Sequence, residues 1–261
     1  MCELLGMECN VPTDITFSFA GLALRGGCTG HHADGWGLAL YEGKAARTFI
    51  EPAPAHDSPL ATFVREHPIR TLLAIAHVRK RTRGAISLVN THPFVREIFG
   101  RHFVFAHNGT VRNVRRFKTG RFTPIGDTDS EWAFCALLSG LQNRFGTTYP
   151  KSTRELWDAV AQISGRIGSV GTFNFLLADG QHLFARCSTN LHHIVRKAPF
   201  SSATLSDDDV KVDFAKLTKA SDRVAVIATQ PLTRDENWVK AEPNTLWVFR
   251  GGELRRTIES R

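Results

Sequence analysis

Short apolar runs bounded by turn residues recur along this chain, and they restrict its fold more than any other feature. Runs of this length, separated by Gly, Asn and Asp, are typical of buried β-strands. They fall at 38–41, 71–78, 102–107, 173–177, 182–187, 223–228 and 246–250. Because few long helices lie between them, they predict an α+β fold in which sheets pack against helical layers. A doubly wound parallel sheet is disfavoured, since regular β-α-β alternation is absent.

Four helices are expected between the strands. They cover residues 15–24, 60–66, 131–141 and 153–163. Ser58 and Pro59 provide an N-cap and a first-turn proline for the second helix. Asp129 or Ser130 is expected to cap the third, whose apolar positions indicate a mostly buried helix.

Composition indicates one globular domain over residues 1–261, because 42% of the residues are apolar and no linker or repeat interrupts the chain. No apolar run reaches 18 residues, so no membrane-spanning helix is expected. Acidic residues stand near the N-terminus where a secretory signal would be basic, which predicts a cytoplasmic protein. The five cysteines form no CxxC pair, and neighbouring histidines in a strand point to opposite faces. We therefore expect no metal and no other cofactor.

The net charge of +8 raises the hypothesis of a nucleic-acid-binding protein. Basic clusters at 79–83 and 112–121 have Phe117 and Phe122 among or beside them, and basic grooves with stacking aromatics bind single strands. No recognition motif of the usual kinds accompanies these clusters, so nucleic acid is disfavoured as a partner.

Cys2 is the first residue with a chemical interpretation. Removal of Met1 would leave a thiol and an α-amine on the same residue, and such an amine has a pKa of about 7.7–8.0. A nucleophile and a general base would then lie side by side. The alternative is a small buried hydrophobic residue, which is what most free cysteines are.

Three further segments have both an ordinary and a catalytic interpretation. Asn108-Gly109 by itself favours a type I′ hairpin turn, yet an Asn amide and a Gly N–H can also hold an oxyanion. Arg79, at the end of a strand, is either a surface arginine or a two-pronged clamp for a carboxylate. Segment 126–131 is either a helix start or the receptor of a substrate ammonium. Together the segments meet the needs of an enzyme that opens the side-chain amide of a free amino acid.

The order of these motifs resembles the class II glutamine amidotransferases, which are N-terminal-nucleophile hydrolases, and within them the compact stand-alone YafJ-like proteins. The resemblance covers nearly the whole chain and implies a four-layer αββα sandwich. It is carried by Met1-Cys2, His77-Val78-Arg79, Asn90-Thr91-His92-Pro93, Phe105 to Gly109 (FAHNG) and Thr128-Asp129-Ser130-Glu131.

The resemblance implies a glutamine amidotransferase with glutaminase chemistry. Cys2 would attack the amide carbon of glutamine, release ammonia and form a γ-glutamyl thioester that water hydrolyses. The α-amine of Cys2 would shuttle the proton. The Asn108 side chain and the Gly109 N–H would form the oxyanion hole.

The resemblance also implies how the substrate is held. Arg79 would bind its α-carboxylate and Asp129 its α-ammonium, while His92 would line the pocket in a supporting role. Lys80 and Arg83 depart from the sugar-isomerising members of the class, which have Trp and His at these places. The departures concern the pocket wall and the acceptor more than the amide chemistry.

The fate of the ammonia is left open by the sequence, because no second catalytic domain is recognised in 261 residues. A separate synthase chain would receive the ammonia, or hydrolysis would be the whole reaction. An alternative is a stand-alone hydrolase of a γ-glutamyl amide conjugate, since the same site residues would contact only the glutamyl half of the substrate.

Overall fold

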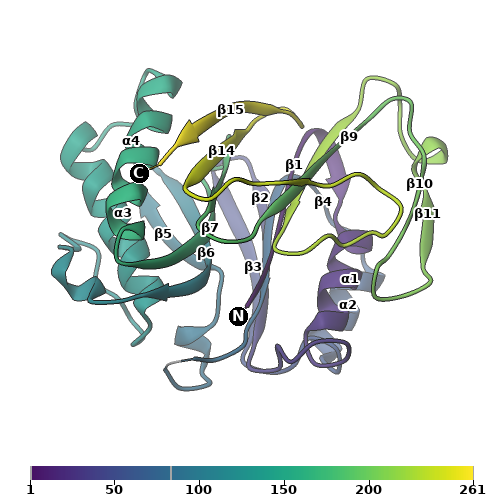
Figure 1. Cartoon of the computed structure of the whole chain (residues 1–261), viewed down its shortest axis with the longest axis horizontal. Coiled ribbons are helices and arrows are strands. Elements are labelled where there is room, and N and C mark those ends of the chain that lie inside the picture. Colours follow the sequence, from purple (N-terminus) through teal and green to yellow (C-terminus); the bar gives the residue numbers. More distant parts are fainter. Residues whose placement is uncertain (1, 83, 261) are drawn as a thin grey trace.

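The computed structural model describes residues 2–82 and 84–260, and it shows two antiparallel sheets packed face to face with two helices outside each (Figure 1). The first sheet has the strand order β13 (Val239–Lys240), β9 (His192–Lys197), β12 (Arg223–Ala228), β1 (Glu3–Asp14), β4 (Arg70–Val78), β2 (Trp36–Glu42) and β3 (Ala45–Glu51). The second has the order β15 (Leu254–Glu259), β14 (Thr245–Phe249), β8 (Leu183–Cys187), β7 (Gly171–Ala178), β6 (Arg101–Val111) and β5 (Phe94–Ile98).

The outer layers are helical. Helices α1 (Thr16–Arg25) and α2 (Pro59–Glu66) cover the seven-stranded sheet, and α3 (Asp129–Phe145) and α4 (Thr153–Gly168) cover the six-stranded sheet. A small hairpin of β10 (Ser202–Thr204) and β11 (Lys211–Asp213) stands apart from both sheets. The expected α+β fold with four αββα layers is confirmed. None of the helices in the described ranges is long and apolar enough to cross a lipid bilayer.

Both faces of the central strands are buried, and this explains their apolar sequences. Along β4, Leu73 and Ile75 face the other sheet, whereas Ala74 and Ala76 face the helices. Gly6 of β1 faces the other sheet too, where a Cβ atom would lie only 2.9 Å from Leu183 Cδ2. A side chain at position 6 would therefore require the side chains of Leu183 and Leu176 to move.

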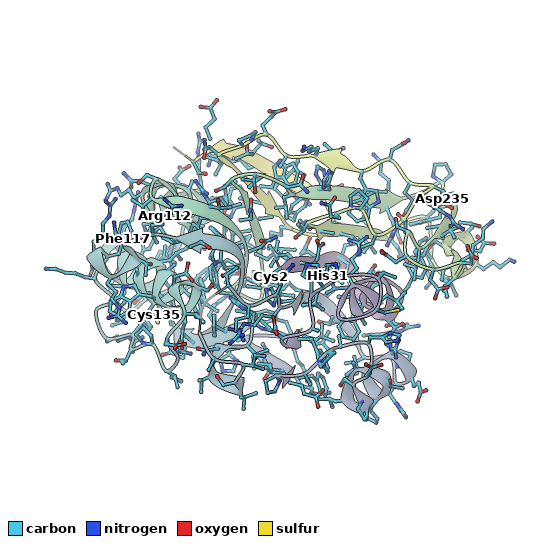
Figure 2. All side chains as sticks on the ribbon, turned by 60° about the horizontal axis from the view of Figure 1, so that its bottom comes forward. Cys2, His31, Arg112, Phe117, Cys135 and Asp235 are labelled. Carbon is cyan, nitrogen blue, oxygen red and sulfur yellow. The ribbon has the colours of Figure 1, made fainter. Side chains whose placement is uncertain are left out.

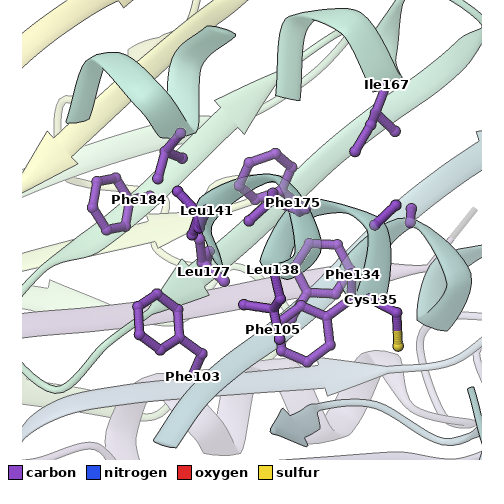
Figure 3. Close-up of a cluster of buried hydrophobic side chains, with 14 of the residues drawn as sticks. Phe103, Phe105, Phe134, Cys135, Leu138, Leu141, Ile167, Phe175, Leu177 and Phe184 are labelled. Carbon is purple, nitrogen blue, oxygen red and sulfur yellow. The ribbon is translucent and has the colours of Figure 1, made fainter. Parts of the chain in front are cut away.

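The core beneath α3 and α4 is rich in phenylalanine (Figure 3). Phe105 of β6 stacks on Phe134 of α3 with ring centroids 5.0 Å apart, and Phe173 and Phe175 of β7 pack beside them. These residues alternate with side chains that face the other sheet, as a strand period of two requires. The cluster holds the ends of β6 and β7 rigidly against α3.

Strand β6 passes straight through Asn108-Gly109, so the hairpin turn that this dipeptide favours by itself is wrong. Asn108 pairs with Asn174 and Gly109 with Phe173 of β7. Gly109 has a φ of +151°, and a Cβ atom there would overlap the Thr172 carbonyl. The glycine is needed for the close approach of the neighbouring backbone within the sheet and does not form a turn between strands.

The helix starts are partly as predicted. Ser58 caps α2 by accepting a hydrogen bond from the Ala61 N–H at 3.0 Å. Helix α3 is capped by Thr128, which accepts from the Glu131 N–H at 3.2 Å, so the expected cap at Asp129 or Ser130 is wrong. Strand β1 was not among the expected strands, although it is central to the first sheet.

Glu8 of β1 is buried, and its carboxylate accepts the N–H groups of Gly251 and Gly252 at 2.6 and 2.8 Å. Burial raises the pKa of Glu8 to about 7 from an ordinary value of 4.5, against the lowering effect of these two donors. The folded protein therefore binds this proton more tightly than the unfolded chain.

We expect Glu8 to contribute stability that is fully present below pH 4.5 and is lost as the pH rises through about 7. The loss amounts to at most about 3 kcal/mol, at 1.36 kcal/mol for each pKa unit. Urea unfolding between pH 4.5 and 8 measures it, with Glu8→Gln as the variant that cannot titrate. Equal pH slopes for the two proteins would contradict this prediction.

Candidate active site

Cys2 stands at the head of β1, where antiparallel pairing brings the ends of two neighbouring strands beside it. Glu3 is opposite Val78, the last residue of β4, and Leu5 is opposite Ala228, the last residue of β12. The Cys2 Sγ lies 3.4 Å from both the backbone N and the backbone O of Lys80. Figure 2 shows Cys2 towards the middle of the molecule. Met1 and Arg83 lie outside the described residues.

The thiol of Cys2 is half-buried, and burial raises its pKa above the ordinary value of 9.0. The Lys80 backbone N–H and the positive charge of Arg79 lower the pKa but do not outweigh burial. The thiol is therefore protonated at neutral pH. It needs a nearby base to become a nucleophile.

Arg79 is only 3% exposed, so the interpretation as a surface arginine is wrong. Its backbone N–H donates to the Gly35 carbonyl at 2.7 Å, and its own carbonyl accepts from the Asp34 N–H at 3.0 Å. Its Nη1 donates to the Ala85 carbonyl at 3.1 Å. The guanidinium is thus held in a fixed place directly after β4, one residue from the contact with Cys2.

The loop that holds Arg79 is also bonded to the start of α3. Asn90 Nδ2 donates to the Ala85 carbonyl at 3.1 Å, and Asn90 Oδ1 accepts from the Asp127 N–H at 3.1 Å. The buried carboxylate of Glu131 accepts from the N–H groups of Ile125 and Gly126. These bonds fix Arg79 and the first residues of α3 relative to one another.

Asp129 is the first residue of α3, where the helix dipole favours a negative charge. Its Oδ2 accepts from the Val111 N–H, two residues beyond Gly109, at 2.6 Å. Asp129 lines a hollow of about 510 Å³ together with Val111, Thr128 and Trp132. The residues that line this hollow do not include Cys2, Arg79 or Asn108.

Asn108 is buried at 1% exposure, next to Gly109 in β6. Its Nδ2 lies 3.5 Å from Thr229 Oγ1, which in turn accepts from the Leu4 N–H at 2.9 Å. Through Thr229, Asn108 is therefore joined to β1, the strand that directly follows Cys2. Within the described part of the chain, the Asn108 Oδ1 has no hydrogen-bond partner.

His92 is buried between two rings, with centroids 4.3 Å from His77 and 4.4 Å from Phe94. Neither ring nitrogen of His92 or of His77 has a hydrogen-bond partner among residues 2–82 and 84–260. Burial lowers the pKa of both histidines, that of His77 to about 3, so both rings are neutral. The supporting role of His92 in substrate binding stays a prediction.

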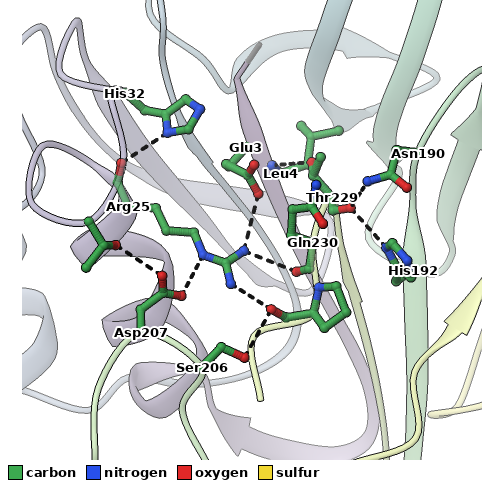
Figure 4. A network of polar contacts seen from close by, with 12 residues as sticks. Glu3, Leu4, Arg25, His32, Asn190, His192, Ser206, Asp207, Thr229 and Gln230 are labelled. Carbon is green, nitrogen blue, oxygen red and sulfur yellow. Dashed lines mark hydrogen bonds and ion pairs between the residues drawn. The ribbon is translucent and has the colours of Figure 1, made fainter. Parts of the chain in front are cut away.

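Arg25 was not singled out by its sequence context, yet it anchors the residue that follows Cys2 (Figure 4). Its guanidinium donates to Glu3 Oε2 at 3.4 Å, to Asp207 Oδ2 at 2.7 Å and to the Pro231 carbonyl at 2.6 Å. Asp207 and Pro231 are more than 180 positions away along the chain. No local pattern marks such a residue, because only the fold brings its partners together.

Two antiparallel sheets between helical layers form the αββα fold of the N-terminal-nucleophile hydrolases, and Cys2 lies at the head of a central strand of this fold. Comparison with known proteins specifies the class further. The chain belongs to the class II glutamine amidotransferases, whose family description it matches over residues 1–261. It is thus an enzyme of the glutamine amidotransferase type.

Individual relatives agree with this assignment. The chain is 50% identical to the YafJ protein of Escherichia coli K12 over 253 residues, which are 97% of this chain and 99% of YafJ. It is also similar to the crystal structure of a predicted glutamine amidotransferase from Pseudomonas aeruginosa, with 41% identity, a TM-score of 0.78 and coverage of 98% and 100%. An allosteric regulatory enzyme of purine biosynthesis shares the fold at 16% identity, with a TM-score of 0.62 and coverage of 100% and 49%.

We expect Glu131→Ala to destabilise the protein by roughly 3 kcal/mol, because it leaves the Arg96 cation partly buried without its partner. The Glu131 side chain is 1% exposed and that of Arg96 is 18% exposed. The control is Glu42→Ala, which removes an exposed ion pair with Arg47 and is expected to cost less than about 0.5 kcal/mol. Chemical denaturation measures both, and equal losses would contradict the role assigned to Glu131.

Proposed function

We propose that the protein, acting as a single domain over residues 1–261, hydrolyses the side-chain amide of glutamine to glutamate and ammonia. The reaction passes through a γ-glutamyl thioester on Cys2. The observation that carries the proposal is the position of Cys2 against the backbone of Lys80, directly beside the buried Arg79. Membership of the class II family supports it.

Arg79 and Asp129 give the site the charges that a free amino acid requires. The guanidinium of Arg79 binds the α-carboxylate, and the carboxylate of Asp129 receives the α-ammonium. Both groups are fixed by backbone hydrogen bonds and by the loop bonds through Asn90, so little ordering is needed on binding. The γ-amide then extends towards Cys2.

The first chemical step forms the thioester. The α-amine that Cys2 gains when Met1 is removed takes the thiol proton, and the sulfur attacks the amide carbon. The oxyanion is stabilised by the Asn108 side chain and the Gly109 N–H. The protonated amine then gives its proton to the leaving nitrogen as the C–N bond breaks, and ammonia departs.

The second step hydrolyses the thioester. The α-amine takes a proton from water, the resulting hydroxide adds to the thioester carbon, and the C–S bond breaks. Glutamate leaves and Cys2 recovers its thiol proton. Arg79 and Asp129 hold only the glutamyl half of the substrate, so the same steps apply to a γ-glutamyl amide conjugate, which releases its amine in place of ammonia. When glutamine is the substrate, a separate synthase chain can accept the ammonia.

The proposal is tested by measuring ammonia release from glutamine and glutamate release from γ-glutamyl conjugates, both with purified protein. Rapid ammonia release that depends on Cys2 supports glutamine as the substrate. Turnover of a conjugate without ammonia from glutamine would overturn the choice of substrate but not of the nucleophile. Covalent labelling of Cys2 by 6-diazo-5-oxo-norleucine identifies the nucleophile directly.

We expect active protein to lack Met1 and Cys2→Ala to lose all measurable turnover while it remains folded. The reason is that the amine is tied up in a peptide bond as long as Met1 is present. Intact-mass measurement reports Met1, and circular dichroism reports folding. Full activity of Cys2→Ala, or of protein that retains Met1, would refute the mechanism.

Arg79→Lys is expected to raise the KM for glutamine by about tenfold or more with a smaller change in kcat, because a point charge cannot reproduce a bidentate grip. Steady-state kinetics measure both constants. Lys80→Arg is the control, because the backbone atoms of Lys80, and not its side chain, contact Cys2. An unchanged KM in Arg79→Lys would remove Arg79 from the substrate-binding residues.

A further inference from the structure

Two buried polar side chains behind Asn108-Gly109 are not used by the proposed chemistry. Asn174, on β7, donates from Nδ2 to the Asn108 carbonyl at 3.1 Å. Its Oδ1 accepts from the N–H groups of Ser188 and Thr189 at 2.7 and 3.0 Å, and its Nδ2 also donates to the Thr189 hydroxyl at 2.9 Å. An amide with so many partners has one orientation, and it is 1% exposed.

The bond from the Asn174 side chain, together with the pairing of Asn108 with Asn174 in the β6–β7 ladder, fixes where the Gly109 N–H points. The Asn108 carbonyl and the Gly109 N–H belong to one peptide group, which is planar and trans, so they point in opposite directions. A donor that holds the carbonyl on the Asn174 side aims the N–H to the other side. The Asn174 side chain therefore braces the peptide group that carries the Gly109 N–H.

The second side chain, Thr229, lies directly after β12 and faces the Asn108 amide. The Thr229 carbonyl is fixed by Asn190 Nδ2 at 2.9 Å and His192 Nδ1 at 3.0 Å (Figure 4). Its hydroxyl oxygen accepts from the Leu4 N–H, which leaves the hydroxyl hydrogen to be donated. Residue 229 is therefore a rigid donor next to Asn108.

The Asn108 amide has nearly the same shape in its two orientations, so its hydrogen bonds decide between them. With Nδ2 on Thr229 Oγ1 at 3.5 Å, Oδ1 has no partner among the described residues. A half-turn of the amide would let Oδ1 accept the Thr229 hydroxyl hydrogen. Nδ2 would then occupy the unpartnered position, and there it can donate to an oxyanion.

We propose that Thr229 and Asn174 are positioning residues that aim the two oxyanion donors: Thr229 orients the Asn108 side-chain amide, and Asn174 orients the Gly109 N–H. The inference rests on the proposed function, because it assigns the two residues a role in that reaction. Neither residue is expected to touch the substrate. Their effect falls on the transition state, where the charge on the oxygen develops.

For Thr229 the test is a double-mutant cycle with Asn108. Thr229→Val is expected to lower kcat by about 10- to 100-fold with an unchanged KM. The reason is that a wrongly oriented donor loses part of the rate factor of roughly 10²–10³ that one oxyanion donor supplies. Thr229→Ser keeps the hydroxyl and is expected to stay within about threefold of the parent. In an Asn108→Ala background, Thr229→Val is expected to cause no further loss of kcat.

For Asn174 the informative pair is Asn174→Asp and Asn174→Ala. The aspartate retains an oxygen for Ser188 and Thr189 but has no N–H for the Asn108 carbonyl. Both variants are expected to lower kcat by about tenfold or more, and the loss is expected to persist in the Asn108→Ala background, since Asn174 acts on Gly109. Glutamine affinity, measured by calorimetry in the Cys2→Ala protein, is expected to be unchanged.

The failure of this inference is distinguishable from failure of the proposed function. Wild-type protein without Cys2-dependent hydrolysis of any γ-glutamyl amide would overturn the function itself. If hydrolysis depends on Cys2 but Thr229→Val and Asn174→Asp retain full kcat, the positioning roles are wrong. A kcat loss accompanied by an equal loss of glutamine affinity, or a loss in Thr229→Val that persists without the Asn108 side chain, would also overturn them.

Discussion

The burial of β1 on both faces is the constraint on which the rest of the structure depends. Leu4 packs between the two sheets and Leu5 packs under the helices, so the strand has no free face and little freedom to shift. Gly6 allows the second sheet to approach closely. Since the strand is fixed in this way, Cys2 at its head has a defined position in spite of being next to a chain end.

Antiparallel pairing places the residues of the candidate site around the start of this fixed strand. The start of one strand lies beside the ends of its neighbours, so β4 and β12 bring Arg79 and Thr229 to the edge where Cys2 precedes β1. Thr229 then reaches Asn108 in the other sheet. The site thus joins both sheets at one edge of the sandwich, while the apolar layers between them set the spacing.

The electrostatics around Cys2 follow from burial. The histidines beneath the site, His77 and His92, are kept neutral, so they add no positive charge to that of Arg79. Burial also keeps the Cys2 thiol protonated, which makes a base close to the sulfur necessary. A fixed arginine beside an uncharged thiol suits the proposed reaction, in which the substrate carboxylate binds before the nucleophile is activated.

The sequence by itself determined the fold class and provided the residues of the proposed site. Strands buried on both faces are usually apolar along most of their length, which is why 223–228 coincides with β12 and 71–78 falls within β4. The motifs around Cys2, Arg79, Asn108 and Asp129 could be recognised in the sequence because each is a short contiguous segment. Tertiary structure alone decided that Asn108-Gly109 continues a strand, and that Thr229, Asn174 and Arg25 stand behind the site. Their hydrogen bonds join residues far apart in the chain, and no local pattern records a contact that exists only after the sheets have packed.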